Sequence, residues 1–435
     1  MIKFPCLYKY FGQNRRMSKV KLPELLAPAG TLDAFRTAIL YGADAIYAGL
    51  PGFSMRARAK ITTDEVKQGI ELAHAAGKKV YLAFNLFAHD FEYANMPRVA
   101  DTIRYLMPDA LIVSDPGIVM WVRENFPEMP IHISTQANIC SAQTVKFWQN
   151  ASAKLCVLAR EVTHAEFKSI RAACPDIGLE IFVHGAMCMS YSGRCLLSNF
   201  ITGRPANRGA CAQLCRWKYD VILRERESGL EMPITEDERG AYIMNSRDLC
   251  LMPCLGEVIS AHPDSLKIEG RNRSEYYVGS VVHAYRAALD AYAANPKDFD
   301  PAPFMDELNR LETRGYTTAF FDGPVTADAH NYETTRSTSD YHAAGVITAV
   351  TDENITFELR NETRPGDTIT FILPGTMDCV TVCLEKLINA KNGETVDKMA
   401  AGMGNSILIP RTWLGGRHSD KFVPYVLAYK AKIRK

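Results

Sequence analysis

The sequence predicts an α/β protein: a closed (β/α)8, TIM-like barrel with a cysteine-rich insertion before its last strand, followed by a small antiparallel β-barrel domain. Eight short apolar runs alternate with amphipathic helical patterns over the first 295 residues, which is typical of a parallel sheet covered on both faces. About 80 residues, with clustered cysteines, separate the last two runs. An open, doubly wound sheet is the competing arrangement, but eight such units favour closure.

The barrel strands are expected at the apolar runs, in chain order. The helix after the first run is expected over 33–41, and the helix after the last run over 276–294. The eight strands are expected at 25–29, 45–48, 80–84, 110–113, 131–133, 155–158, 179–183 and 265–268.

From residue 343 onward the pattern changes to short strands separated by turn residues, which indicates a second, antiparallel domain. Its strands are expected at 345–348, 355–359, 368–372, 380–382, 406–409 and 423–429. We therefore divide the chain into an N-terminal extension (1–21), a catalytic barrel (22–295) with an insertion at 185–262, a connecting segment (296–340) and a C-terminal β domain (341–435).

Composition and charge exclude several classes of protein. The chain has 435 residues, 47% of them hydrophobic and 23% charged, which indicates a globular rather than a disordered protein. The net charge of +1 excludes a uniformly basic nucleic-acid binder, although a local basic face is compatible with it. No apolar run approaches 18 residues, so we expect no membrane span. The polar, basic N-terminus is unlike a secretory signal, so a cytoplasmic protein is expected.

Twelve cysteines are present, and six of them fall between Cys188 and Cys254. Clustered cysteines in a cytoplasmic chain indicate metal binding or catalysis rather than disulfides. Cys188 and Cys195 are two helical turns apart, and Cys211 and Cys215 one turn apart. Four thiolates suit zinc or an iron–sulfur cluster, and the lack of tight two-residue knuckles favours the cluster. The alternative is that these cysteines are small buried apolar residues.

Chemistry in a (β/α)8 barrel occurs at the carboxyl ends of the strands. Polar residues follow most of the predicted strands, and we expect two of them, Asp115 and Glu161, to be caps or structural ion pairs. The predicted catalytic residues are His184, Lys267 and Glu269. The predicted substrate-binding residues are Arg56, Arg58, Asn85, Gln136 and Arg271; the arginines suit carboxylates or phosphates, which guanidinium groups bind through two hydrogen bonds.

Two further patterns bear on function. The protease motifs H-E-x-x-H and G-x-S-x-G are absent from the sequence. Basic residues alternate with aromatic ones at 216–219, near Arg204 and Arg208, which suits phosphate contacts and base stacking; a solvated surface explains the pattern equally well. The C-terminal domain is expected either to bind RNA through residues such as Arg411 and Lys421 or only to pack against the barrel.

Several motifs resemble the collagenase-like peptidase family U32. They are Glu24–Gly30, Gly42–Tyr47, Glu180–Ser198, Asn207–Arg216 and Ser265–Arg271. Within that family, residues 216–219 and 242–248 look most like the branch that hydroxylates tRNA, using prephenate to make 5-hydroxyuridine at the wobble position.

The resemblance implies a [4Fe–4S] cluster held by Cys188, Cys195 and Cys211, with Cys215 as the fourth ligand and Cys250 as its alternative. It also implies tRNA as substrate, prephenate as co-substrate, and iron–sulfur delivery or electron-transfer proteins as partners. The alternative functions are a collagenase-like peptidase, hydroxylation of another RNA or of a small molecule, and a non-enzymatic RNA-binding factor.

Overall fold

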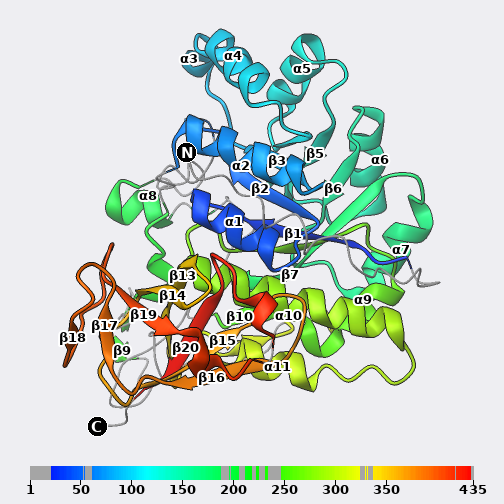
Figure 1. The fold of residues 1–435 in the computed structure, drawn as a ribbon. Coiled ribbons are helices and arrows are strands. Elements are labelled where there is room, and N and C mark those ends of the chain that lie inside the picture. Colours follow the sequence, from blue (N-terminus) through cyan, green and yellow to red (C-terminus); the bar gives the residue numbers. More distant parts are fainter. Residues whose placement is uncertain are drawn as a thin grey trace.

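The computed structural model describes residues 21–51, 53, 61–187, 195, 197–204, 211–217, 222–224, 231–233, 246–323, 329, 331, 337–416 and 418–432. Figure 1 shows a barrel with the C-terminal sheet, in orange and red, beside α1 and α10, while α3, α4 and α5 lie together at the opposite end of the molecule. No helix in the described part of the chain is both long and apolar enough to cross a membrane.

Eight parallel strands close into a barrel, which confirms the predicted fold class. Each strand pairs in parallel with its neighbour, and the last strand pairs with both the first and the seventh, so the parallel strands form a closed ring. The strands are β1 (Glu24–Pro28), β2 (Ala45–Gly49), β3 (Lys79–Phe84), β4 (Ala110–Val113), β5 (Ile131–Ile133), β6 (Leu155–Val157), β7 (Gly178–Ala186) and β11 (Ser265–Ile268).

Helices surround this ring, and short polar side chains start many of them. Asp115 caps the helix that follows β4, because its carboxylate accepts a hydrogen bond from the Ile118 N–H (3.1 Å), as expected for a structural residue. The helices are α1 (Leu32–Leu40), α2 (Thr63–Ala75), α3 (Asp90–Tyr93), α4 (Met96–Leu106), α5 (Pro116–Asn125), α6 (Ala142–Asn150), α7 (His164–Ala173), α8 (Leu197–Thr202), α9 (Leu255–Ser260), α10 (Glu275–Ala294) and α11 (Ala302–Leu308).

Three aspartates, each directly before a strand, fasten the amino-terminal end of the barrel. Asp264 accepts a hydrogen bond from the backbone N–H of Leu179 in β7 (3.0 Å) and pairs with Arg171 of α7. Asp44 and Asp109 repeat this arrangement on β1 and β3. Each carboxylate therefore joins a strand to its neighbour at the end opposite the predicted site.

The insertion adds strands above the barrel that the sequence did not predict. Residues 184–186 of β7 extend beyond β11 and pair with the antiparallel β10 (Asp248–Cys250), which pairs with β12 (Tyr316–Thr317). Asp248 is buried and forms ion pairs with Arg314 and Arg273. The strands β8 (Ile222–Arg224) and β9 (Glu231–Pro233) form a separate hairpin.

The C-terminal domain is a curled antiparallel sheet, with two short strands (β17 and β18) beyond the predicted six. The strand order is β16-β15-β20-β13-β14-β19-β17-β18. The strands are β13 (Tyr341–Val350), β14 (Asn354–Leu359), β15 (Thr368–Ile372), β16 (Cys379–Cys383), β17 (Leu387–Asn389), β18 (Thr395–Val396), β19 (Ser406–Pro410) and β20 (Leu427–Ala431).

This sheet shares its core with the barrel helices. The buried Tyr41, at the end of α1, donates a hydrogen bond to the Ile372 carbonyl (2.8 Å) and accepts one from the Leu427 N–H (2.9 Å). Gly279 of α10 allows the Leu427 side chain to approach, since a Cβ there would lie 2.4 Å from it. Both parts of the chain therefore contribute to one continuous apolar core.

Candidate active site

A buried ion pair lies inside the barrel. The Lys267 ammonium is 2.7 Å from Oε1 of Glu180, whose other oxygen accepts a hydrogen bond from Ser265 (2.7 Å). Both charged side chains are at most 5% exposed. The ammonium also lies 4.5 Å from the ring centroid of Tyr47 in β2, which is separated from β11 by β1 alone. A carboxylate and an aromatic face together stabilise the charged form of a buried lysine.

Two arginines lie at the carboxyl ends of β6 and β11, the two barrel strands that pair with β7. The Arg160 guanidinium stacks 3.7 Å from the Phe182 ring centroid and lies 3.6 Å from a Glu269 oxygen. The Arg271 guanidinium is 5.6 Å from the Tyr47 ring, and the residue is only 8% exposed. The aromatic rings therefore contact guanidinium groups that have lost most of their hydration through burial.

Two amide side chains also lie at the carboxyl ends of the barrel strands, among the residues that the structure describes. Gln136 is buried, and its carbonyl oxygen accepts a hydrogen bond from Ser114 (3.2 Å). Asn85, directly after β3, is also buried. The predicted Asn85, Gln136, Lys267, Glu269 and Arg271 therefore all follow or end barrel strands in the structure, whereas the predicted Arg56 and Arg58 lie outside the described residues.

Two glycines hold the Glu269–Arg271 segment against the barrel. A Cβ on Gly30 would lie 1.9 Å from the Arg271 carbonyl oxygen, so only glycine fits beside it. Gly185 has a φ of +117°, and a Cβ there would lie 2.4 Å from the Glu269 carbonyl oxygen. Because the backbones lie this close together, the two glycines fix the positions from which the Glu269 and Arg271 side chains extend.

These side chains form a cationic cup. Arg160, Lys267 and Arg271 carry three positive charges, and Glu180 and Glu269 carry two negative ones, so the five groups have a formal charge of +1. Burial strengthens the attraction of such groups for an anion, and guanidinium matches carboxylate and phosphate geometry. The arrangement therefore suits an anionic ligand bound above aromatic rings.

His184 has a different environment from the cup. Its ring is 1% exposed and lies among Tyr277 and Tyr285 of α10 and Tyr316 of β12, with centroids 5.3 to 5.9 Å away. Burial, helped by the positive charge of Arg273, lowers the pKa of His184 to about 3, so the imidazole is neutral. The predicted catalytic role of His184 stays a prediction.

Two of the predicted cluster ligands, Cys211 and Cys215, belong to a hydrogen-bonded unit made of α8 and residues 211–217. Ser198 joins the two segments: its hydroxyl accepts a hydrogen bond from the Ala212 N–H (2.9 Å) and donates one to the Arg204 carbonyl (2.6 Å). The exposed Cys211 sulfur accepts a hydrogen bond from the Gln213 N–H (3.3 Å). A third predicted ligand, Cys195, lies two residues before the start of α8.

The donor set of this unit fits an iron–sulfur cluster. Cysteine thiolates are the usual ligands, and hydrogen bonds to sulfur tune such clusters. The fourth predicted ligand, Cys188, lies outside the described residues. Among the residues that the structure does describe, no group of three or more His, Cys, Asp or Glu side chains is gathered closely enough to hold a metal ion.

Cys250, the alternative fourth ligand, lies in the packed core. Its sulfur is 3.9 Å from the Tyr285 hydroxyl and 3.7 Å from the Met305 sulfur. Burial raises the pKa of the Cys250 thiol to about 11, so the thiol is protonated at neutral pH. The choice between Cys215 and Cys250 as the fourth ligand stays a prediction.

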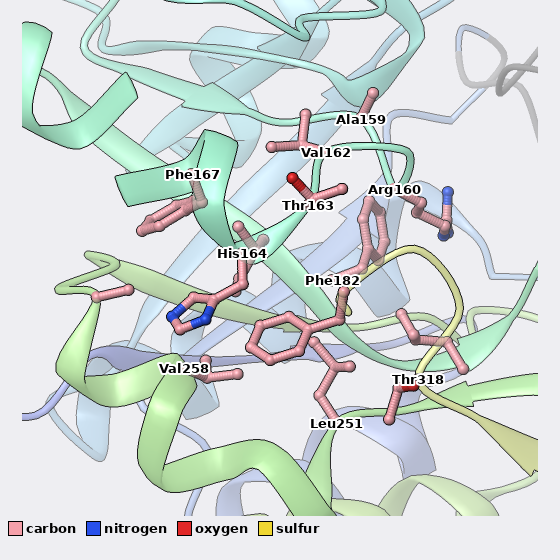
Figure 2. Close-up of a pocket in the computed structure, with 14 residues that line it drawn as sticks. Ala159, Arg160, Val162, Thr163, His164, Phe167, Phe182, Leu251, Val258 and Thr318 are labelled. Atoms are coloured by element: carbon pink, nitrogen blue, oxygen red, sulfur yellow. The ribbon is translucent and has the colours of Figure 1, made fainter. Parts of the chain in front are cut away.

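A separate, largely apolar cavity lies on the outer side of the barrel wall, between α7 and α9. Its volume is about 480 Å³, counting the part open to solvent. Figure 2 shows Arg160 at one side of it and His164 at the other, with Phe167, Leu251 and Val258 among the lining side chains. Arg160 therefore borders both this cavity and the cup.

Sequence reasoning missed three contributors to the cup: Glu180, Phe182 and Tyr47. Residues two apart in a strand face the same side of a sheet, so Glu180 and Phe182 share a face of β7, as Ser265 and Lys267 do in β11. A single charged residue within an otherwise apolar strand was the signal that could have identified Glu180.

A closed parallel barrel with a buried cationic cup at the carboxyl ends of its strands defines a TIM-barrel protein with an enzyme-like site. The model of peptidase family U32 matches residues 30–331, and the chain belongs to this family.

Three relatives from bacteria illustrate the range of the family. The chain is 38% identical to the tRNA hydroxylation protein P of Escherichia coli, over 89% of this chain and 93% of that protein. It is 35% identical to the 23S rRNA 5-hydroxycytidine C2501 synthase of Escherichia coli, over 68% of this chain and 45% of that protein. It is 34% identical to a collagenase of Porphyromonas gingivalis, over 69% of this chain and 73% of that protein.

Proposed function

We propose that this protein is a tRNA-modifying enzyme that hydroxylates the wobble uridine to 5-hydroxyuridine, with prephenate as co-substrate. The observation that carries the proposal is the buried cationic cup at the carboxyl ends of the barrel strands. Two relatives that match across most of the barrel are named for the hydroxylation of RNA, one of them over nearly its whole length.

The cup supplies the binding chemistry that this reaction needs. Prephenate has two carboxylates, and Arg160 and Arg271 offer two guanidinium groups, with the Lys267 ammonium beneath them. Glu180 forms an ion pair with Lys267, and Glu269 forms one with Arg160. A base must leave its stack to reach an enclosed site, and the rings of Tyr47 and Phe182 offer aromatic surface to receive it.

The proposal includes a [4Fe–4S] cluster held by Cys188, Cys195, Cys211 and Cys215. When bound, the cluster would supply electron transfer, a Lewis-acidic iron or a structural clamp at the rim. Iron and sulfide assays after anaerobic purification test the ligand set directly. Cys211→Ser and Cys215→Ser should each lose most of the iron, whereas Cys250→Ala should retain it. If instead Cys215→Ser retained the iron and Cys250→Ala lost it, Cys250 would be the fourth ligand.

Nucleoside analysis of tRNA from a deletion strain tests the reaction. Loss of 5-hydroxyuridine and its derivatives, restored by the wild-type gene but not by an Arg271→Gln variant, is the expected result. Any second enzyme that makes the same mark must be deleted first. Unchanged 5-hydroxyuridine in that background would disprove the proposal, and a parallel collagen-degradation assay of the purified protein tests the peptidase alternative.

A further inference from the structure

The unit formed by α8 and residues 211–217 carries large apolar side chains that the cup does not use. Phe200 is 86% exposed, Trp217 is 48% exposed and Ile201 is 47% exposed. Extensive exposure of large apolar residues in a folded protein indicates a surface that another molecule contacts. Because the Ser198 hydroxyl accepts a hydrogen bond from the Ala212 N–H and Arg204 donates one to the Cys211 carbonyl, Phe200 and Trp217 are carried by one connected unit.

The charge of residues 181–219 indicates what kind of molecule contacts this surface. From residue 181 to residue 219 the sequence has five basic residues and no acidic one, although the chain as a whole has one acidic residue in about nine. The basic residues are Arg194, Arg204, Arg208, Arg216 and Lys218. An uninterrupted positive charge in a protein of net charge +1 is complementary to a polyanion.

Two other exposed aromatic residues, Phe91 and Phe147, lack this combination. Phe91 is 67% exposed, but Asp90 and Glu92 flank it in α3. Phe147 in α6 is 60% exposed and has one basic neighbour, Lys146. Aromatic faces beside positive charges are the features by which proteins bind unpaired nucleotides, because the rings stack on bases and the cations contact phosphates.

We propose that α8 and residues 211–217 form a docking platform for unpaired nucleotides of the RNA substrate, on which Phe200 and Trp217 stack bases and Arg204 contacts phosphate. The platform would hold nucleotides that flank the reacting one, while the cup receives the reacting base. The inference rests on the proposed function in taking RNA as the ligand, and it adds the surface that recognises RNA in its single-stranded form.

Fluorescence anisotropy with the full-length protein tests the platform. The probe is a synthetic 17-nucleotide stem-loop RNA with an unpaired seven-nucleotide loop, titrated at several salt concentrations. Phe200→Ala and Trp217→Ala should each weaken binding by about 5-fold to 100-fold, which is the usual range for loss of one stacked base. Phe200→Tyr should bind like the wild type, since it keeps an aromatic face.

Two further variants separate the contribution of base stacking to RNA binding from that of charge and from that of exposure alone. Arg204→Gln should weaken binding and lower the slope of log affinity against log salt by about 0.7, whereas the alanine variants should leave the slope unchanged. Phe147→Ala, at an aromatic residue of α6 that is 60% exposed, should bind like the wild type. A fully paired RNA of the same length should not distinguish Phe200→Ala from the wild type.

Wild-type affinity for the stem-loop in both alanine variants would overturn the platform, as would equal losses with the fully paired RNA. Loss of turnover without loss of RNA affinity would also overturn it, because the surface would then serve a protein partner. A wild-type protein that binds the loop through Phe200 but forms no hydroxylated uridine would disprove the proposed function and keep the platform. A wild-type protein that hydroxylates RNA while both variants bind normally would disprove only the platform.

Discussion

At the scale of individual residues, the cup depends most on the ion pair between Lys267 and Glu180. Glu180→Gln should lower the free energy of unfolding by about 3–5 kcal/mol, because it leaves a buried ammonium without its carboxylate. The double variant Glu180→Met/Lys267→Met should recover most of that stability, since apolar residues of similar size replace both charges. Hydroxylation should be lost in both variants. Urea unfolding and nucleoside analysis measure the two effects; a double variant as unstable as Glu180→Gln would contradict the argument.

Gly30 affects the cup because it lets the backbone that bears Glu269 and Arg271 lie close to β1. Gly30→Ala places a Cβ 1.9 Å from the Arg271 carbonyl oxygen, so the segment that bears Glu269 and Arg271 must move. A displacement of about 1 Å in a binding group can reduce kcat/KM by about 100-fold, and that is the expected result in a steady-state assay. Gly256→Ala in α9 is the control, because the nearest atom to its added Cβ would be at an ordinary 3.4 Å. Equal activity of the two variants would show that the segment adapts.

At the scale of elements, His283 links α10 to α11 and to the loop after β15. Nδ1 lies 2.9 Å from both Glu307 oxygens, and Nε2 lies 2.9 Å from the Thr376 carbonyl oxygen. Both partners are acceptors, so both ring nitrogens must carry protons and the ring is an imidazolium. Burial by itself lowers the pKa of His283, but Glu307 and the backbone carbonyl outweigh it and the pKa is raised.

This arrangement predicts how stability depends on pH. The stabilisation from His283 is fully present below its unfolded pKa of about 6.5 and is lost as pH rises through the raised folded pKa. His132 and His184, whose pKa values burial lowers to about 3, act in the opposite direction: below pH 6.5 only the unfolded chain binds their protons. Urea unfolding from pH 5 to pH 9 should therefore show maximum stability near pH 6.5. The alkaline decline should be smaller in Glu307→Gln; an unchanged decline would assign it to other groups.

At the scale of the whole molecule, Tyr41 joins the barrel to the C-terminal sheet. Tyr41→Phe leaves the Leu427 N–H and the Ile372 carbonyl without this partner in a buried interface, so the free energy of unfolding should fall by about 1–3 kcal/mol. Because the two parts share one core, they should still unfold in a single transition. Trp413 lies in the C-terminal part and Trp121 and Trp148 in the barrel, so single-tryptophan versions report each part separately. Tyr105→Phe, at a half-exposed site, is the control; two separate transitions would contradict the shared core.

The shared core also changes how the C-terminal domain must be studied. Removing it would uncover Tyr41 and the Gly279 face of α10, so a shortened chain would be unstable whatever the domain binds. Arg411 and Lys421 donate hydrogen bonds to backbone carbonyls of the same domain, which gives both a structural role. An RNA-binding role of this domain stays a prediction, to be tested with point variants of the full chain.

The sequence alone determined the barrel, its eight strands and the antiparallel second domain. These follow from local patterns: near-continuous apolar runs, helical periodicity and turn residues are properties of neighbouring residues. The positions of Lys267, Glu269 and Arg271 at a strand end were predictable for the same reason, because a parallel barrel brings all carboxyl ends together.

Only the tertiary structure decided which of these residues meet. Glu180 and Lys267 are 87 residues apart and meet because β7 pairs with β11. Lys267 meets Tyr47 because ring closure pairs β11 with β1, which lies next to β2. The three-residue strand β10 is too short to show a periodicity, and its pairing with β7 places Cys250 in the core. The 86% exposure of Phe200 is likewise a property of the folded chain. Contacts between barrel strands and the exposure of single side chains depend on the tertiary structure, and they define both the cup and the proposed platform.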